Sequence, residues 1–185
     1  MNTEPGPGTA EPPAPEPDVK DWTFVITEGC SQCGFSPFDP HDTAQRLRDS
    51  IPRWQAVLAR PGVRTRPQPG VWSPLEYGCH VRDVCAVFGG RLRAMLDADI
   101  DDGARFDDWD QDAAALAGHY WDDDPAGVSG EFSRRAARLA SDWDAVTGDQ
   151  WGRHGLRSNG SPFTVATLGI YLVHDLEHHL HDVGG

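Results

Sequence analysis

Residues 164–183, TVATLGIYLVHDLEHHLHDV, have the pattern of an amphipathic helix, and the interpretation of the chain starts from them. Leucine recurs at every fourth position and so forms one apolar stripe along such a helix, at Leu168, Leu172, Leu176 and Leu180. Thr164 is placed to cap the first turn, and Phe163 and Leu168 are placed as a hydrophobic staple. The segment therefore predicts a helix that buries its leucines against other helices.

Three further long helices are predicted upstream, and each begins with a capping residue followed by proline, at Asp39-Pro40, Ser73-Pro74 and Asp124-Pro125. Ser73 and Glu76 also form a capping box, and the helix that follows should run to about Leu96. Pro52 should interrupt and kink the first of the three helices. A shorter helix is expected around residues 113–120.

Four long helical patterns without an alternating strand pattern predict an all-α fold, an antiparallel four-helix bundle over residues 39–185. One strand signal is the Asn-Gly pair in residues 153–163, RHGLRSNGSPF, which is compatible with a short hairpin. Residues 21–38 are expected to form an extended N-terminal arm on the bundle. Residues 1–20 are rich in Pro and Glu and are expected to be disordered.

Charge and hydropathy narrow the class of protein. The 185-residue chain has a net charge of −13 and no basic cluster, which disfavours nucleic-acid binding. No segment approaches the roughly 18 apolar residues of a membrane span, and no signal peptide precedes the arm. We therefore expect a cytoplasmic protein without nucleic acid or membrane among its partners. Its four cysteines should be thiols or metal ligands rather than disulfides.

Histidines form a second stripe on the C-terminal helix. Positions i, i+4 and i+7 share a helix face, which places His174, His178 and His181 together. An i, i+4 histidine pair can bind one divalent cation at about 2.0–2.1 Å, and His80 on an earlier helix is the best candidate for a third ligand. Three imidazoles leave a coordination position open, as in catalytic sites. The alternative is that these histidines pack in the core or lie on the surface.

The same helix contains H-x-x-E-H, which is the inverted zinc-protease signature and would make Glu177 a general base. A protease is the weaker hypothesis, because few residues follow the motif to supply a further carboxylate ligand.

Two motifs in this order resemble the DinB-like superfamily. They are W-S-P-L-E-Y-x-x-H at residues 72–80 and H-x-x-x-H-H at residues 174–179. The superfamily includes the metal-binding domain of mycothiol-dependent maleylpyruvate isomerase and the thiol S-transferases that use bacillithiol or mycothiol. The resemblance covers residues 40–183 and implies a metal-binding four-helix bundle.

Residue by residue, the resemblance implies that His80, His174 and His178 are the metal ligands. It implies no ligand role for His179. His181 would support the site or face the substrate.

The resemblance also implies an activity. A divalent cation, zinc first and nickel, iron or manganese as alternatives, would bind a low-molecular-weight thiol and lower its pKa for attack on a small electrophile. The Ala- and Gly-rich composition, with many more Arg than Lys, is typical of an actinobacterial source and favours mycothiol as the thiol. The candidate contacts beside the metal or the substrate are His181, Arg82, Asp83, Tyr171 and Trp72.

An enzyme of this kind, a transferase or isomerase, predicts an open metal position that faces a pocket lined by Trp72, Tyr171 and Trp109. The rival hypothesis is a non-catalytic, stress-related protein that binds a metal or ligand, with a homodimer as a candidate assembly. Metal-dependent hydrolase or lyase chemistry is a third hypothesis. No residue is assigned as a catalytic acid or base.

The arm carries Cys30-Ser-Gln-Cys33-Gly34, which resembles half of a zinc knuckle. A structural zinc needs four ligands, and the sequence contains no second C-x-x-C. Three hypotheses stay open for Cys30 and Cys33: free thiols, a second metal site completed by His41 or another residue, or redox chemistry. Cys79 is expected to pack in the core, and Cys85, six residues later on the same helix, is expected to point in a different direction.

Overall fold

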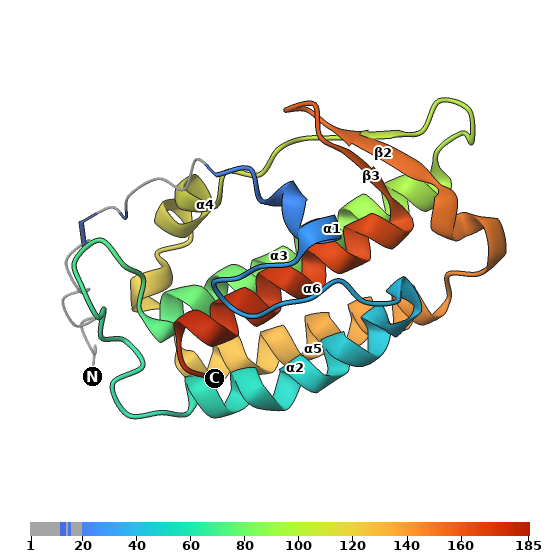
Figure 1. Ribbon diagram of the computed structural model, residues 1–185. Coiled ribbons are helices and arrows are strands. Elements are labelled where there is room, and N and C mark those ends of the chain that lie inside the picture. The colour runs from blue at the N-terminus through green and yellow to red at the C-terminus, as the bar shows by residue number, and fades with distance from the viewer. Residues whose placement is uncertain (1–11, 14, 16–19) are drawn as a thin grey trace, which may run out of the picture.

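The computed structural model describes Pro12, Pro13, Pro15 and residues 20–185 (Figure 1). Apart from Pro12, Pro13, Pro15 and Lys20, the predicted disordered tail at residues 1–20 lies outside the described part of the chain. Four long helices form a bundle: α2 (Thr43–Leu58), α3 (Pro74–Asp97), α5 (Pro125–Asp144) and α6 (Val165–Asp182). None of the described helices is long and apolar enough to span a membrane.

The helix starts follow the local sequence. Ser73 and Glu76 make the reciprocal capping box of α3, and the side chain of Asp124 accepts a hydrogen bond at the start of α5. Thr164 caps α6 in the same way. Asp39 caps a short 3₁₀ helix, η2 (Pro40–Asp42), that leads into α2. Pro52 lies inside α2, and the helix continues on both sides of it instead of being interrupted.

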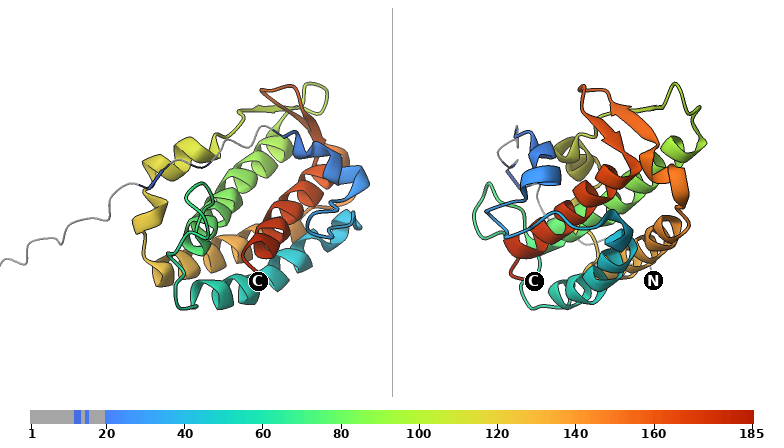
Figure 2. Two further views of the ribbon diagram at one scale, coloured as in Figure 1. Left: turned by 60° about the vertical axis from the view of Figure 1, so that its left-hand side comes forward. Right: turned by 45° about the vertical axis from the view of Figure 1, so that its right-hand side comes forward.

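The direction of the helices departs from a purely antiparallel bundle. Figures 1 and 2 show that α2 and α6 run in one direction, whereas α3 and α5 run in the other. The reason is the long connection between α3 and α5, residues 98–124. It contains α4 (Gln111–Ala117) and η3 (Tyr120–Asp122) and returns along the bundle, so α5 begins at the end where α3 begins.

A small three-stranded sheet corrects the all-α prediction. The hairpin expected at residues 153–163 is present as β2 (His154–Arg157) and β3 (Pro162–Thr164), after η4 (Gly148–Gly152). Strand β1 (Ala104–Phe106) pairs parallel to β2. Strand β1 was not predicted because its three residues are too few to show an alternation of apolar and polar side chains. Its approach to β2 requires glycine at Gly155, where a Cβ would lie 2.6 Å from the Phe106 ring.

The main core lies between the four helices. It contains Trp54 from α2, Leu92 from α3, and Phe132 and Trp143 from α5. The leucine stripe of α6 is fully buried in this core, at Leu168, Leu172, Leu176 and Leu180. This packing fixes the rotation of α6 about its axis and so decides where its histidines point.

The N-terminal arm folds against α6, but it is not simply extended. It begins with η1 (Trp22–Phe24) and α1 (Val25–Glu28) and continues into a turn that is closed by a bridge between Cys30 and Phe35. The two bridge residues pack with Val25 against Ile170 and Val173 of α6. Cys79 is buried, as expected, and Cys85 is buried as well.

Candidate metal centre

The last helix presents two chemically distinct faces besides its leucine stripe. A helix turns about 100° per residue, so two overlapping i, i+4 pairs face different directions. One pair is His174 and His178, and the other is Asp175 and His179. Each pair meets residues from a different part of the chain.

Asp175 and His179 meet His80 from α3, and we call these three residues the His80 cluster. One ligand atom from each residue lies within 4.8 Å of the other two. Asp175 Oδ1 is 3.1 Å from His80 Nε2 and 3.7 Å from His179 Nε2. Ligands bound at about 2.0–2.1 Å around a tetrahedral cation lie roughly 3.4 Å apart, so these separations suit one ion.

Asp182 orients His179 within the cluster. The Nδ1 atom of His179 lies 2.9 Å from Asp182 Oδ2 and can donate its hydrogen to that carboxylate. The Nε2 atom then keeps its lone pair on the side of Asp175. Metal-binding histidines commonly have this carboxylate partner, because it fixes the tautomer and the ring orientation.

The protonation states of the cluster also favour a cation. Burial lowers the pKa of His80, so its imidazole is neutral at pH 7. Burial alone would raise the pKa of Asp175, but the nearby His80 and His179 lower it to about 2. His80 Nε2, the nitrogen on the side of Asp175, can then offer its lone pair to a cation.

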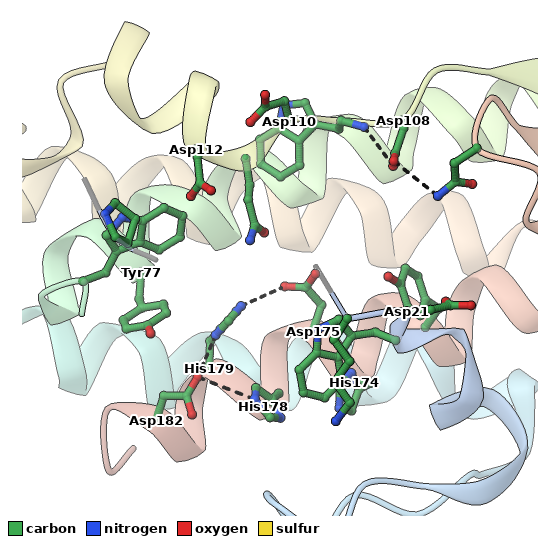
Figure 3. A pocket seen from close by; sticks show the side chains of 18 of the residues that line it. Asp21, Tyr77, Asp108, Asp110, Asp112, His174, Asp175, His178, His179 and Asp182 are labelled. Atoms are coloured by element: carbon green, nitrogen blue, oxygen red, sulfur yellow. Dashed lines mark hydrogen bonds and ion pairs between the residues drawn. The ribbon is translucent and has the colours of Figure 1, made fainter. Parts of the chain in front are cut away.

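A cavity of about 950 Å³ adjoins the His80 cluster. Asp175 and His179 project from α6 into this cavity, and Asp112 points toward it from the opposite side (Figure 3). Its lining is rich in aromatic side chains, at Trp22, Trp72, Tyr77, Trp109 and Tyr171. It is also acidic, with six aspartates against one lysine and one arginine, at Asp21, Asp108, Asp110, Asp112, Asp175, Asp182, Lys20 and Arg157.

Aromatic rings enclose the histidines of the cluster. Trp109 stacks on His80 at 5.4 Å between ring centroids, and Trp72 lies 5.5 Å from the same ring. Tyr77 packs on His179 at 4.8 Å. These rings cover His80 and line the cavity together with Asp175 and His179.

His174 and His178 face the arm, where they meet Cys30 and Cys33. We call these four residues the arm cluster. One ligand atom from each of the four lies within 4.8 Å of all the others.

The structure therefore divides the three histidines that the sequence analysis grouped as one site. His80 lies with Asp175 and His179, whereas His174 and His178 lie in the arm cluster. Both pairs on α6 have the same i, i+4 spacing, and only the packing of the helix shows which of them faces α3. His179, for which no ligand role was expected, belongs to the His80 cluster.

Sequence analysis missed Asp175 and Asp182. A usable signal was present, since D-x-x-x-H at residues 175–179 has the same spacing as H-x-x-x-H, and a carboxylate can replace an imidazole as a ligand. Asp182 lies three residues after His179, which is a spacing at which side chains on a helix meet.

Trp72, Tyr171 and Trp109 line the cavity, as expected, but Arg82 and Asp83 do not. Arg82 donates to Asp123 at 2.7 Å, and Asp83 accepts from the Tyr120 hydroxyl at 2.6 Å. Arg135 of α5 also donates to Asp83, at 2.7 Å. These residues join α3, η3 and α5 and belong to neither cluster.

Three other candidates are also placed elsewhere. His181 is exposed and belongs to neither cluster. His41 lies 2.7 Å from Asp39 instead of completing a site with the two arm cysteines. Glu177 accepts two hydrogen bonds from Arg46, at 2.9 and 3.0 Å, so it is held away from the role of a protease base.

Comparison with known proteins identifies the family and the fold. The family model for the DinB superfamily matches residues 61–183. Among solved structures, the chain is similar to YfiT from Bacillus subtilis, which is described as a probable metal-dependent hydrolase with an unusual four-helix bundle topology. The similarity has a TM-score of 0.68 at 16% identity and covers 78% of this chain and 85% of YfiT, so it shows a common fold. No curated protein matches the chain.

Proposed function

The chain belongs to the DinB superfamily, and on that premise we propose that it is a metal-dependent enzyme that activates a low-molecular-weight thiol for attack on a small electrophile. One observation carries the proposal. The ligand atoms of His80, Asp175 and His179 converge within 4.8 Å, and two of these residues line a cavity of about 950 Å³. A ligand in that cavity can reach the cluster from the side that the protein leaves open.

His80, Asp175 and His179 would hold the cation, with zinc as the first candidate and nickel, iron or manganese as alternatives. Two imidazoles and one carboxylate are a donor set found in catalytic zinc sites, which keep a fourth position for a ligand. When bound, the cation supplies a Lewis acid that lowers the pKa of a neighbouring thiol or water.

The side chains around the cluster have separate tasks. Asp182 holds His179 in the required orientation, and Asp175 bridges the two histidines. Trp109 and Trp72 pack on His80 and exclude water from the buried side. These contacts preorganise the cluster before a ligand arrives.

The chemistry of the cavity favours mycothiol, a thiol carried on sugar and inositol rings. Aspartate carboxylates accept hydrogen bonds from hydroxyl groups, and aromatic faces pack against the CH groups of such rings. The excess of aspartates also disfavours thiols that carry several carboxylates, such as glutathione, because like charges repel.

In the proposed transfer, the thiolate sulfur forms a bond to the electrophilic carbon. The leaving group departs with its electron pair, and the thiol proton passes to solvent. In an addition to an activated double bond, a proton is taken up by the adjacent carbon instead.

Hydrolysis is a second candidate, and the description of YfiT as a probable metal-dependent hydrolase favours it. Water would then replace the thiol as the nucleophile at the same cluster. A non-catalytic protein that binds a metal and a ligand, alone or as a homodimer, is the alternative without chemistry.

The test is conjugate formation from mycothiol and monochlorobimane by the zinc-loaded, untagged protein, followed by mass spectrometry. His80→Ala and His179→Ala should abolish the conjugate. His181→Ala is the matched control, because His181 lies on the same helix but is exposed and outside both clusters. Equal rates in all four proteins contradict the proposal.

Two parallel measurements separate the alternatives. Release of nitrophenol from nitrophenyl esters without thiol, lost in the same two variants, would support the hydrolase. Binding of mycothiol by calorimetry without turnover of any electrophile would support the non-catalytic protein.

A further inference from the structure

We infer that Cys30, Cys33, His174 and His178 form a structural zinc site that fastens the N-terminal arm to α6. This site is separate from the His80 cluster and does not depend on the proposed enzymatic function. The four residues combine a C-x₂-C turn with an H-x₃-H helix, which is the ligand spacing of Cys₂His₂ zinc sites. The cysteines and the histidines are more than 130 residues apart in sequence, so only the fold brings them together.

The separations of the ligand atoms suit a zinc ion. Cys30 Sγ lies 3.7 Å from His178 Nδ1. A sulfur at about 2.3 Å and a nitrogen at about 2.0–2.1 Å from a tetrahedral zinc are roughly 3.6 Å apart. The other ligand atoms of the arm cluster lie within 4.8 Å of one another, so small side-chain adjustments are sufficient to bind an ion.

His174 supplies an independent observation. Its side chain is only 3% exposed, and its Nε2 atom has no hydrogen-bond partner among the described residues. A buried polar atom without a partner is unfavourable, typically by about 1–3 kcal/mol. A cation bound at the arm cluster gives this imidazole a ligand.

His178 is oriented for the same site. Its Nδ1 faces Cys30, while its Nε2 lies 3.8 Å from Asp182 Oδ2. The Nδ1 atom is therefore the nitrogen of His178 that lies on the side of the sulfur, while the carboxylate of Asp182 lies near the opposite side of the ring. Asp182 thus contacts one histidine of each cluster.

The turn around the cysteines is shaped like a ligand loop. The Gly34 amide donates to the Cys30 carbonyl at 2.8 Å, and the Cys30 amide donates to the Phe35 carbonyl at 2.8 Å. Gly29 and Gly34 both have positive φ, at 75° and 77°. A Cβ at Gly29 would lie 2.5 Å from the Phe35 carbonyl oxygen, so the turn needs glycine there.

Aromatic side chains pack against the two histidines of the arm cluster, which also border the cavity. Trp22 lies 4.8 Å from the His178 ring and 5.5 Å from the His174 ring, and Phe35 lies 5.1 Å from His174. Four protein ligands fill a tetrahedral ion and leave no position for a substrate. The site is therefore structural, in contrast to the three-ligand His80 cluster.

The rival redox hypothesis fits less well. A redox C-x-x-C needs a thiol with a lowered pKa, usually at the start of a helix. Here α1 ends before Cys30, and the next helical segment begins at Pro40. Burial raises the pKa of Cys33, although the Phe35 amide that points at its sulfur acts in the opposite direction.

The site has a consequence for the cavity. Asp21 and Trp22 of the arm line the cavity next to the His80 cluster. A zinc ion would hold the arm on one face of α6. It would thereby fix the wall of the cavity that Asp21 and Trp22 form, opposite Asp175 and His179 on the other face of α6.

The test is metal analysis of the untagged full chain, purified under reducing conditions and loaded with zinc or cobalt. We expect about two metal ions per chain, one for each cluster. Cys30→Ser/Cys33→Ser should remove one ion, together with the thiolate-to-cobalt charge-transfer absorption. His80→Ala should remove the other ion and leave that absorption unchanged. Cys79→Ala/Cys85→Ala is the matched control and should keep the absorption.

A second measurement shows what the ion does. Amide hydrogen exchange of residues 22–38 should rise in the Cys30→Ser/Cys33→Ser variant and in chelated wild type, while the helical circular dichroism of the bundle persists. Three results would overturn the inference: unchanged metal content in the double variant, no thiolate absorption in the cobalt protein, or a Cys30–Cys33 disulfide trapped by alkylation of the protein from cells. None of these bears on the His80→Ala result, so the two proposals can fail separately.

Discussion

His178 and His179 are consecutive residues, but their imidazole rings belong to two different clusters. The ring centroids are 5.6 Å apart and the rings are nearly perpendicular, at 81°. His178 faces Cys30, and His179 faces His80 and Asp175. The helix thereby presents one candidate metal-binding face to the arm and another to α3.

Single substitutions at these neighbours should separate the two clusters. His179→Ala should lower the metal affinity of the His80 cluster by at least about 100-fold. Loss of a side chain that only supports a ligand typically lowers metal affinity by about 10–100-fold, and here a ligand itself is lost. His178→Ala should instead lose the cobalt–thiolate absorption. Competitive zinc titration with a coloured chelator measures both. Loss of the same ion in both variants would show that the clusters are one site.

Asp175 should accept a change of ligand type but not a loss of ligand. Asp175→His restores three imidazoles around one ion and should keep the metal. Asp175→Ala removes a donor and should lower the metal affinity of the His80 cluster by at least about 100-fold. Metal content after dialysis against a weak chelator distinguishes the two variants. Full metal retention by Asp175→Ala would exclude Asp175 as a ligand.

Asp182→Asn should weaken both clusters, because this carboxylate contacts His179 at 2.9 Å and His178 at 3.8 Å. The expected loss of affinity is about 10–100-fold at the His80 cluster, as for other hydrogen-bonded partners of metal-binding histidines, and smaller at the arm cluster, where Asp182 is not hydrogen-bonded. Glu177→Gln is the control on the same helix, since Glu177 pairs with Arg46. Zinc titrations of the two variants should therefore differ, and equal affinities would remove Asp182 from both clusters.

The metal-free protein should lose stability as the pH falls from 6.5 to 4. Burial lowers the pKa of His174 from 6.5 to about 4, so below pH 6.5 the unfolded chain takes up a proton that the folded chain does not. The stabilisation is complete above pH 6.5 and falls by about 2–3 kcal/mol toward pH 4. Burial lowers the pKa of His80 and His178 too, and these shifts act in the same direction.

Urea denaturation in the presence of a chelator measures this dependence. His174→Gln should reduce this slope over the same window, because it removes one titrating imidazole and leaves the contributions of His80 and His178. A variant with the same slope as wild type would assign the effect to other groups.

Gly29→Ala should detach the arm without unfolding the bundle. The added Cβ would lie 2.5 Å from the Phe35 carbonyl oxygen at a residue with a φ of 75°, a strain of about 1–3 kcal/mol. Gly34→Ala is the control, since its φ is 77° but no atom lies within 4 Å of the added Cβ. Hydrogen exchange of residues 22–38 should rise more in Gly29→Ala than in Gly34→Ala, and the reverse order would contradict the described turn.

Local sequence patterns determined much of the fold. The capping residues at Ser73, Asp124 and Thr164 marked the starts of three bundle helices, and the Asn-Gly pair marked the hairpin. These features depend on hydrogen bonds and turns within a few residues, so the chain carries them wherever it folds. The short strand β1 and the shared direction of α3 and α5 escaped prediction, because both depend on how a long connection returns along the bundle.

The candidate site, too, was predicted in part from local sequence and decided in part by tertiary packing. The sequence by itself showed that residues 174–182 carry side chains able to bind a metal at a helical spacing and that His80 lies on another helix, and it left the role of Cys30 and Cys33 open. Two i, i+4 pairs one residue apart differ by about 100° of rotation, and no local pattern distinguishes them. Burial of the leucine stripe in the bundle core set that rotation, and tertiary packing alone therefore decided that Asp175 and His179 meet His80 while His174 and His178 meet the cysteines.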